Sequence, residues 1–174
     1  ERERGQELLD KALLGDVGAL RLLVASGADV NFVDEEAGWG RATPLINAAT
    51  TGSKAAVMAL LVLGANVDAV DANGWTALHR AAGKGHKAVV ASLLQAGGDA
   101  RKQDKDGLSP ADWARFCGHE EVASLLTHSA THAVAQRPPS APLPDDAHPE
   151  EGKSVSVNGS NGGEGVSVNG DNGG

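Results

Sequence analysis

The sequence predicts an all-α solenoid of stacked helix pairs, followed by a disordered tail. The first basis of this prediction is an internal repeat. Segments that begin at Thr43, Thr76 and Ser109 are 33 residues apart and match position by position. Its second basis is that each copy holds two short apolar-patterned segments separated by glycine. A fixed period of this size indicates units that bury their apolar faces only against their neighbours.

Four repeats are expected within a domain over residues 5–130. The first is a looser copy, because Leu23 and Gly27 lie 37 residues before Leu60 and Gly64 instead of 33. The four extra residues fall in the polar, glycine-rich segment EEAGWGRA, where a loop insertion is expected. The expected bounds of repeats one to four are 5–36, 40–72, 73–105 and 106–128.

Within each repeat the residue pattern predicts two helices. A hydroxyl residue opens the first helix, where it can cap the backbone amides, and proline or alanine follows it. Glycine ends this helix after about eight residues because it enters the left-handed conformation without steric cost. Apolar residues then recur at helical spacing, for example Val57, Leu60 and Leu61, and a second glycine ends that segment. The first helices are expected to begin after Thr43, Thr76 and Ser109 and to end at Gly52, Gly85 and Gly118.

Composition separates the repeats from residues 138–174. This tail is rich in Pro, Gly, Asn and Ser, has no aromatic residue, and carries one Lys against six acidic residues, so it holds −5 of the net charge of −8. Too little apolar surface is available to offset the entropy of ordering, so the tail is expected to be disordered. The pentapeptide VSVNG occurs twice in it, and a low-complexity linker is favoured over a repeated docking motif or short strands.

Charge and composition also narrow the classes of partner. Residues 1–137 carry −3 and no stripe of Lys and Arg, which argues against nucleic acid. No apolar run reaches 18 residues, so no membrane insertion is expected. The single Cys fits a reducing compartment, and we expect an intracellular monomer, cytoplasmic or nuclear. Because the chain begins without Met, it is interpreted as a fragment or a processed product.

The period and the string GWTALHRAAGKGHKAVVASLL resemble the ankyrin repeat family over about residues 5–127. The resemblance implies antiparallel helix pairs, β-hairpin loops at right angles to them, and a role in binding proteins. The sequence departs from the family pattern at Ile46, where the family has His, and at Ala111 and Asp112, where it has Leu and His. The first and last repeats therefore look like caps.

The resemblance further implies that a partner is recognised by the hairpin tips and the concave face of the first helices. Trp75 is the expected central anchor, since Trp is favoured at binding hot spots. The alternative is that the indoles of Trp39 and Trp75 fold back over the neighbouring hairpin. The candidate partner-binding residues are Trp39, Arg41, Ala72, Asn73, Trp75, Lys105 and Leu108 at the tips, and Thr50, Thr51 and Lys84 on the helices.

Other residues with possible chemistry are expected to be structural. Trp113 is assigned to the core of the last repeat, because large aromatic side chains bury well at a cap. The family pattern gives His79, His86 and His119 the role of bonding backbone groups of the adjacent turn. No Cys or carboxylate accompanies them at ligand spacing, so no metal is expected, and no phosphate loop or nucleophile motif indicates a cofactor or a catalytic residue.

The resulting hypothesis is a non-catalytic scaffold or adaptor that binds a protein or peptide. The alternative is a regulatory or targeting arm of a larger enzyme or transporter, of which this chain is a fragment. A purely structural spacer is the third possibility, and an exposed Trp75 argues against it.

Overall fold

The computed structural model describes residues 2–34 and 40–135, with side chains described as far as residue 130. Residues 138–174, which include both VSVNG segments, and Trp39 lie outside the described residues. Within the described ranges there are eight helices and no strand. The helices are α1 (Arg2–Leu14), α2 (Val17–Ala25), α3 (Pro44–Thr51), α4 (Lys54–Val62), α5 (Ala77–Gly83), α6 (Lys87–Gln95), α7 (Pro110–Phe116) and α8 (Glu120–Ala135).

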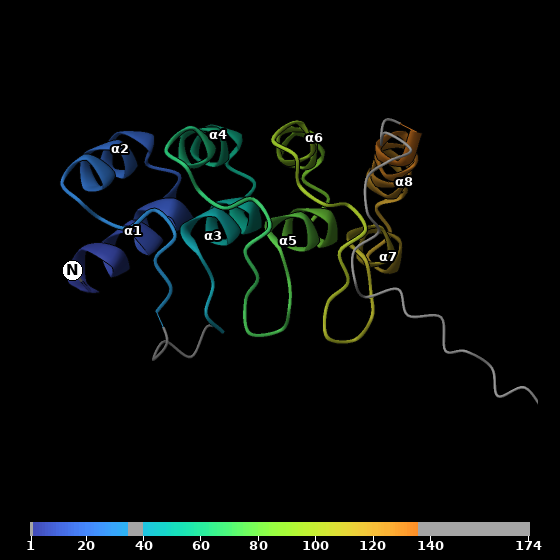
Figure 1. Cartoon of the computed structure of the whole chain (residues 1–174), viewed down its shortest axis with the longest axis horizontal. Coiled ribbons are helices and arrows are strands. Elements are labelled where there is room, and N and C mark those ends of the chain that lie inside the picture. The colour runs from blue at the N-terminus through green and yellow to red at the C-terminus, as the bar shows by residue number, and fades with distance from the viewer. Residues whose placement is uncertain (1, 35–39, 136–174) are drawn as a thin grey trace, which may run out of the picture. The chain divides into compact units, whose positions relative to one another are not determined.

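The helices form two parallel rows, which confirms the solenoid of helix pairs (Figure 1). The inner row comprises α1, α3, α5 and α7, and the outer row comprises α2, α4, α6 and α8. Each helix contacts its neighbours in its own row and its partner within the repeat. The loops between repeats project from the side of the inner row (Figure 1).

The expected helix caps are present. The hydroxyls of Thr43, Thr76 and Ser109 each accept a hydrogen bond from the backbone amide three residues later, at 3.3–3.4 Å. Gly52 and Gly85 follow the first helices with φ of 77° and 74°. A Cβ at either glycine would lie 2.7 Å from a ring atom of His86 or His119, so each glycine also makes room for the next repeat.

Two helices differ from the expected bounds. α1 begins at Arg2, before the expected start of the domain at residue 5. α8 continues to Ala135, beyond the expected end of the fourth repeat at residue 128. No Gly or Pro occurs between Glu120 and Ala135, so nothing in the local sequence stops α8 at the place where glycine ends α4 and α6.

The loops are hairpin turns joined side by side. The backbone N–H of Asp71 donates to the carbonyl of Trp75, and that of Asp104 donates to the carbonyl of Leu108, both at 3.0 Å. Adjacent loops are linked by a hydrogen bond from the Lys105 amide to the Asn73 carbonyl at 3.1 Å. The backbone pairing of a hairpin is therefore present, although no described residue belongs to a strand.

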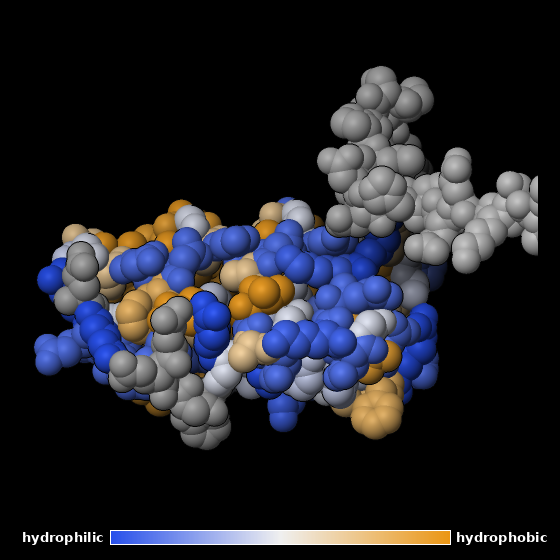
Figure 2. Space-filling view, turned by 60° about the horizontal axis from the view of Figure 1, so that its bottom comes forward, coloured by the Kyte–Doolittle hydropathy of each residue, from blue (hydrophilic) through white to orange (hydrophobic). Residues whose placement is uncertain are grey.

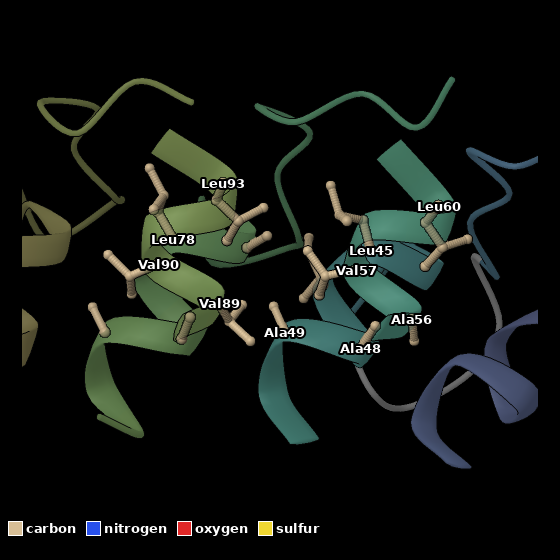
Figure 3. Close-up of a cluster of buried hydrophobic side chains, with 14 of the residues drawn as sticks. Leu45, Ala48, Ala49, Ala56, Val57, Leu60, Leu78, Val89, Val90 and Leu93 are labelled. Carbon is tan, nitrogen blue, oxygen red and sulfur yellow. The ribbon is translucent and has the colours of Figure 1, made fainter. Parts of the chain in front are cut away.

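The core lies between the two rows and continues from one repeat to the next (Figure 3). Leu60 and Leu93 occupy the same place in repeats two and three and are fully buried. The inner helices contribute small side chains that let adjacent repeats approach closely, and all of these are fully buried: Ala48, Ala49, Ala81 and Ala82. Within residues 2–34 and 40–135, no helix combines the length and the apolar character needed to cross a membrane.

We predict that Leu60→Ala or Leu93→Ala lowers the free energy of unfolding by about 2–5 kcal/mol, because each change leaves a cavity in a fully packed core. Leu22→Ala is the matched control: Leu22 is 73 % exposed on α2, and its loss should cost no more than about 0.5 kcal/mol. Urea titration followed by circular dichroism measures all three. Equal losses for Leu22 and Leu60 would contradict the assigned core.

Candidate functional site

A groove of about 610 Å³ opens on the inner row, between α1 and α3. Figure 2 views the side of the repeats that carries the loops and shows apolar surface sunk between hydrophilic borders. The groove is lined by Gln6, Leu9, Asp10, Leu13, Asp34, Arg41, Ala42, Ile46, Asn47, Thr50 and Arg80.

The floor of the groove is apolar, and its border is charged. Ile46 is buried, whereas Leu13 is 44 % exposed and offers apolar surface to a ligand. Charged side chains of both signs lie around these apolar residues, among them Asp10 and Arg41, which are both exposed. An apolar floor with a polar border is the arrangement typical of a protein–protein contact.

Ile46 explains part of the shape of the groove. In repeat three the same position is His79, whose imidazole is buried between two repeats. The backbone amide of Thr76 donates to Nδ1 at 3.1 Å, so the neutral ring donates through Nε2 to the carbonyl of Leu108 at 3.2 Å. Burial lowers the pKa of His79, which favours this neutral form. Ile46 cannot make these bonds and contributes only apolar surface.

The structural role implied for the histidines is confirmed for two of them. His79 bonds the next loop through Leu108, and His86 donates through Nε2 to the carbonyl of Thr50 at 3.2 Å. In each case an imidazole of one repeat satisfies a backbone carbonyl of another. Among the described residues, no group of three or more His, Cys, Asp or Glu side chains is placed to hold a metal ion.

Trp75 is not the exposed tip residue that we expected. Its indole is half-buried and folds over the next loop, where Nε1 donates to Oδ2 of Asp104 at 2.8 Å. The Trp113 ring packs edge to face against the Trp75 ring, with 4.8 Å between the two centroids. The guanidinium carbon of Arg80 lies over the Trp75 ring, 4.2 Å from its centroid. The expectation of an exposed indole was therefore wrong. The hydrogen bond and the ring contacts stabilise the folded-over position of the indole more than exposure to water would.

Asp104 holds this cluster together by accepting four hydrogen bonds. The residue is only 7 % exposed. Its Oδ2 accepts from the indoles of Trp75 and Trp113 at 2.8 and 2.7 Å, and its Oδ1 accepts from the backbone amides of Asp106 and Leu108, both at 2.9 Å. Burial by itself raises the pKa of the Asp104 carboxyl, but the four donors outweigh burial and hold the pKa below its ordinary value.

Asp71 has the same role one repeat earlier. Its Oδ1 accepts from the backbone amides of Asn73 and Trp75 at 2.8 and 3.0 Å. Its Oδ2 accepts from the guanidinium of Arg80 at 2.7 Å, and its side chain is fully buried. The two loops are thus anchored alike through Oδ1, and the donor to Oδ2 differs between the repeats.

Among the described residues, two of the expected partner-binding residues line the groove. Arg41 lines it from the loop before α3, with the unusual positive φ of 62°. Thr50 lines it from α3, and its hydroxyl donates to the carbonyl of Ile46 at 2.8 Å. Thr51, on the same helix, is exposed but does not line the groove.

The remaining expected residues lie along the inner row and the loops. Asn73 and Lys105 are exposed on adjacent loops, and Ala72 is half-buried beside Asn73. Leu108 is 37 % exposed on the second of these loops, and Lys84 is exposed at the end of α5. None of these five residues lines the groove.

The sequence interpretation missed Leu9, Asp10 and Leu13, the α1 side of the groove. Leu13 follows Leu9 by four residues and Asp10 by three, which places all three on one helix face. Repeat one is a looser copy of the others, so no aligned inner-helix position pointed to these residues. Their helical spacing was visible in the sequence, but alignment of the repeats did not reveal it.

We predict that Trp75→Phe lowers the free energy of unfolding by roughly 1–3 kcal/mol at pH 7, because it removes one donor to a buried carboxylate. The pKa of Asp104 is lower in the folded protein than in the unfolded chain, so its contribution is present above about pH 4 and is lost as the pH falls through the folded pKa. The deficit of the variant should therefore shrink at acid pH.

Urea titrations at pH 7 and pH 3 measure this difference, and an Asp104→Asn background supplies the control. In that background the effect of Trp75→Phe should fall by at least half, because the two residues act through one hydrogen bond. Fully additive losses would show that Trp75 acts through packing alone.

Comparison with known proteins identifies the repeat. A family model described as ankyrin repeats (3 copies) matches residues 8–104 and again residues 57–137. Comparison with curated proteins gives no match. The two family matches together span most of the chain and include the helices on both sides of the groove. The chain therefore belongs to the ankyrin repeat family.

Proposed function

We propose that this protein is a non-catalytic interaction module whose groove between α1 and α3, with the adjacent loop tips, binds a protein or peptide. Ankyrin repeats are generally protein–protein interaction modules. The observation that carries the proposal is the groove itself, where partly exposed leucine lies among charged and polar side chains.

The energetic centre of this surface is Leu13. Its side chain is 44 % exposed, and covering it with a partner removes apolar surface from water. The polar lining around it can form hydrogen bonds that fix the orientation of the bound segment. Asn73 and Lys105, exposed on adjacent loops, extend the proposed surface along the inner row.

The mixed charges of the groove favour selective binding of particular partners over attraction of any partner of one charge. Acidic and basic side chains both line the groove, as Asp10 and Arg41 show. Such a border suits a partner with complementary charges and disfavours one that carries a single sign throughout. A polypeptide segment with mixed polar and apolar side chains is the proposed ligand.

We predict that Leu13→Gln weakens binding of the partner at least tenfold, because a central apolar contact is lost. Leu14→Gln is the matched control: Leu14 is the next residue of α1, is 77 % exposed and does not line the groove. Gln preserves helix propensity in both variants. A partner captured from source extract and purified, then titrated by calorimetry, gives the affinities, and equal affinity for both variants would contradict the proposed surface.

A further inference from the structure

One position on the inner row differs in size from repeat to repeat. It is occupied by Leu13 on α1, Thr50 on α3, Gly83 on α5 and Phe116 on α7, which are 37, 33 and 33 residues apart. Leu13 is 44 % exposed and Phe116 is 83 % exposed, whereas Thr50 and Gly83 are half-buried. The inner strip formed by these four residues therefore has large apolar side chains at its two ends and small ones in its middle.

The middle of the inner strip has room for a partner. Of the described atoms beyond the neighbouring backbone, only Sγ of Cys117 lies within 4 Å of a Cβ placed on Gly83, at 3.9 Å. The hydroxyl of Thr50 donates to the carbonyl of Ile46 at 2.8 Å, so it turns back towards its own helix. A partner segment can therefore pass over α3 and α5 and still touch both ends of the strip.

Phe116 is held in place although its ring is exposed. The ring packs edge to face against that of Trp113, with 5.9 Å between the two centroids. Trp113 is itself fixed, because its Nε1 donates to the buried carboxylate of Asp104 at 2.7 Å. A ring that is already ordered gains contact area on binding and loses little freedom. The α7 end of the strip is therefore suited to an apolar side chain of a partner.

The charge of the middle favours a carboxylate in the partner. Neither α3 nor α5 contains Asp or Glu. Lys84, which follows Gly83, is exposed, and no ion pair links its ammonium group to a described residue. The other cation of α5, Arg80, is already paired with Asp71 at 2.7 Å. An acidic side chain of the partner is therefore favoured beside Lys84.

We propose that the partner lays one extended segment along the inner strip, with an apolar side chain on Leu13, a carboxylate beside Lys84 and a second apolar side chain on Phe116. This inference rests on the proposed function and extends it from the groove to α7. It describes the partner by a sequence pattern, in which an acidic residue lies between two apolar residues.

The spacing of that pattern follows from the geometry of the repeats. Neighbouring packed helices lie about 8–10 Å apart, so the three intervals from α1 to α7 measure about 24–30 Å. An extended chain rises about 3.3 Å per residue, so the two apolar residues should be about seven to nine positions apart. Side chains an even number of positions apart share one face of an extended chain, which favours a spacing of about eight. Because α5 lies two intervals from α1, the acidic residue should be nearer to the residue on Phe116.

The test uses a phage-displayed library of random 12-residue peptides, selected against the full chain, and calorimetric titration of a purified enriched peptide. We expect enriched peptides to share two apolar residues about eight positions apart, with Asp or Glu between them. Phe116→Gln and Leu13→Gln should each weaken binding at least tenfold, because each removes an apolar contact. Val62→Gln is the matched control, since Val62 is also 83 % exposed but lies on the outer helix α4. Thermal melts verify that the variants remain folded.

Two changes to the peptide distinguish a spanning segment from two unrelated contacts. Removal of three residues between the apolar positions should prevent the peptide from reaching both ends, so Leu13→Gln or Phe116→Gln should lose its effect. Replacement of the acidic residue by its amide should abolish the weakening caused by Lys84→Gln, because the two groups act through one contact.

The other outcomes overturn the inference and separate it from the proposed function. If Leu13→Gln weakens the peptide but Phe116→Gln does not, the partner does not span the strip, and the proposed groove stands. If Phe116→Gln alone weakens it, or neither substitution does, recognition lies outside the groove and both fail. A shortened peptide that binds as tightly as the full one would overturn the inference even if Phe116→Gln did not fold. If no peptide is enriched, the inference fails, and the proposed function then stands only if Leu13→Gln weakens the natural partner.

Discussion

A buried carboxylate at the end of each repeat determines how one helix pair meets the next. Asp71 and Asp104 are nearly inaccessible to water, so their oxygens need donors from the protein itself. Oδ1 takes two loop amides in both repeats, which fixes the shape of the loop. Oδ2 takes a side chain from the following inner helix, which ties the loop to that helix. The shape of the loop and the stacking of the helices therefore depend on each other, because the same carboxylate bonds the loop backbone and the following inner helix.

At the groove the loop carboxylate, Asp34, has a donor on the preceding inner helix, α1. On α1, Gln6 donates to Asp34 and Arg2 forms an ion pair with it. The position that corresponds to Arg80 is the shorter Asn47. The groove between α1 and α3 on the inner row is lined by partly exposed leucine and by charged side chains.

The sequence was sufficient to predict the repeating part of the fold but not the site. The 33-residue period, the capping hydroxyls and the glycines with positive φ are local signals, and each appears in the structure where it was expected. The orientation of Trp75 depends on Asp104, 29 residues away, and on a ring from the next inner helix, so its own neighbours in sequence could not reveal it. The groove depends on how α1, outside the strict period, packs against α3.

The most direct test of the shared carboxylate is an NMR titration of the two indole N–H signals, Trp75 and Trp113, from neutral to acid pH. One oxygen of Asp104 accepts both donors, so both signals should move together with one midpoint, below the ordinary pKa of an aspartate. Separate midpoints, or signals that do not respond before the protein unfolds, would contradict the account in which a single buried carboxylate joins the last two repeats.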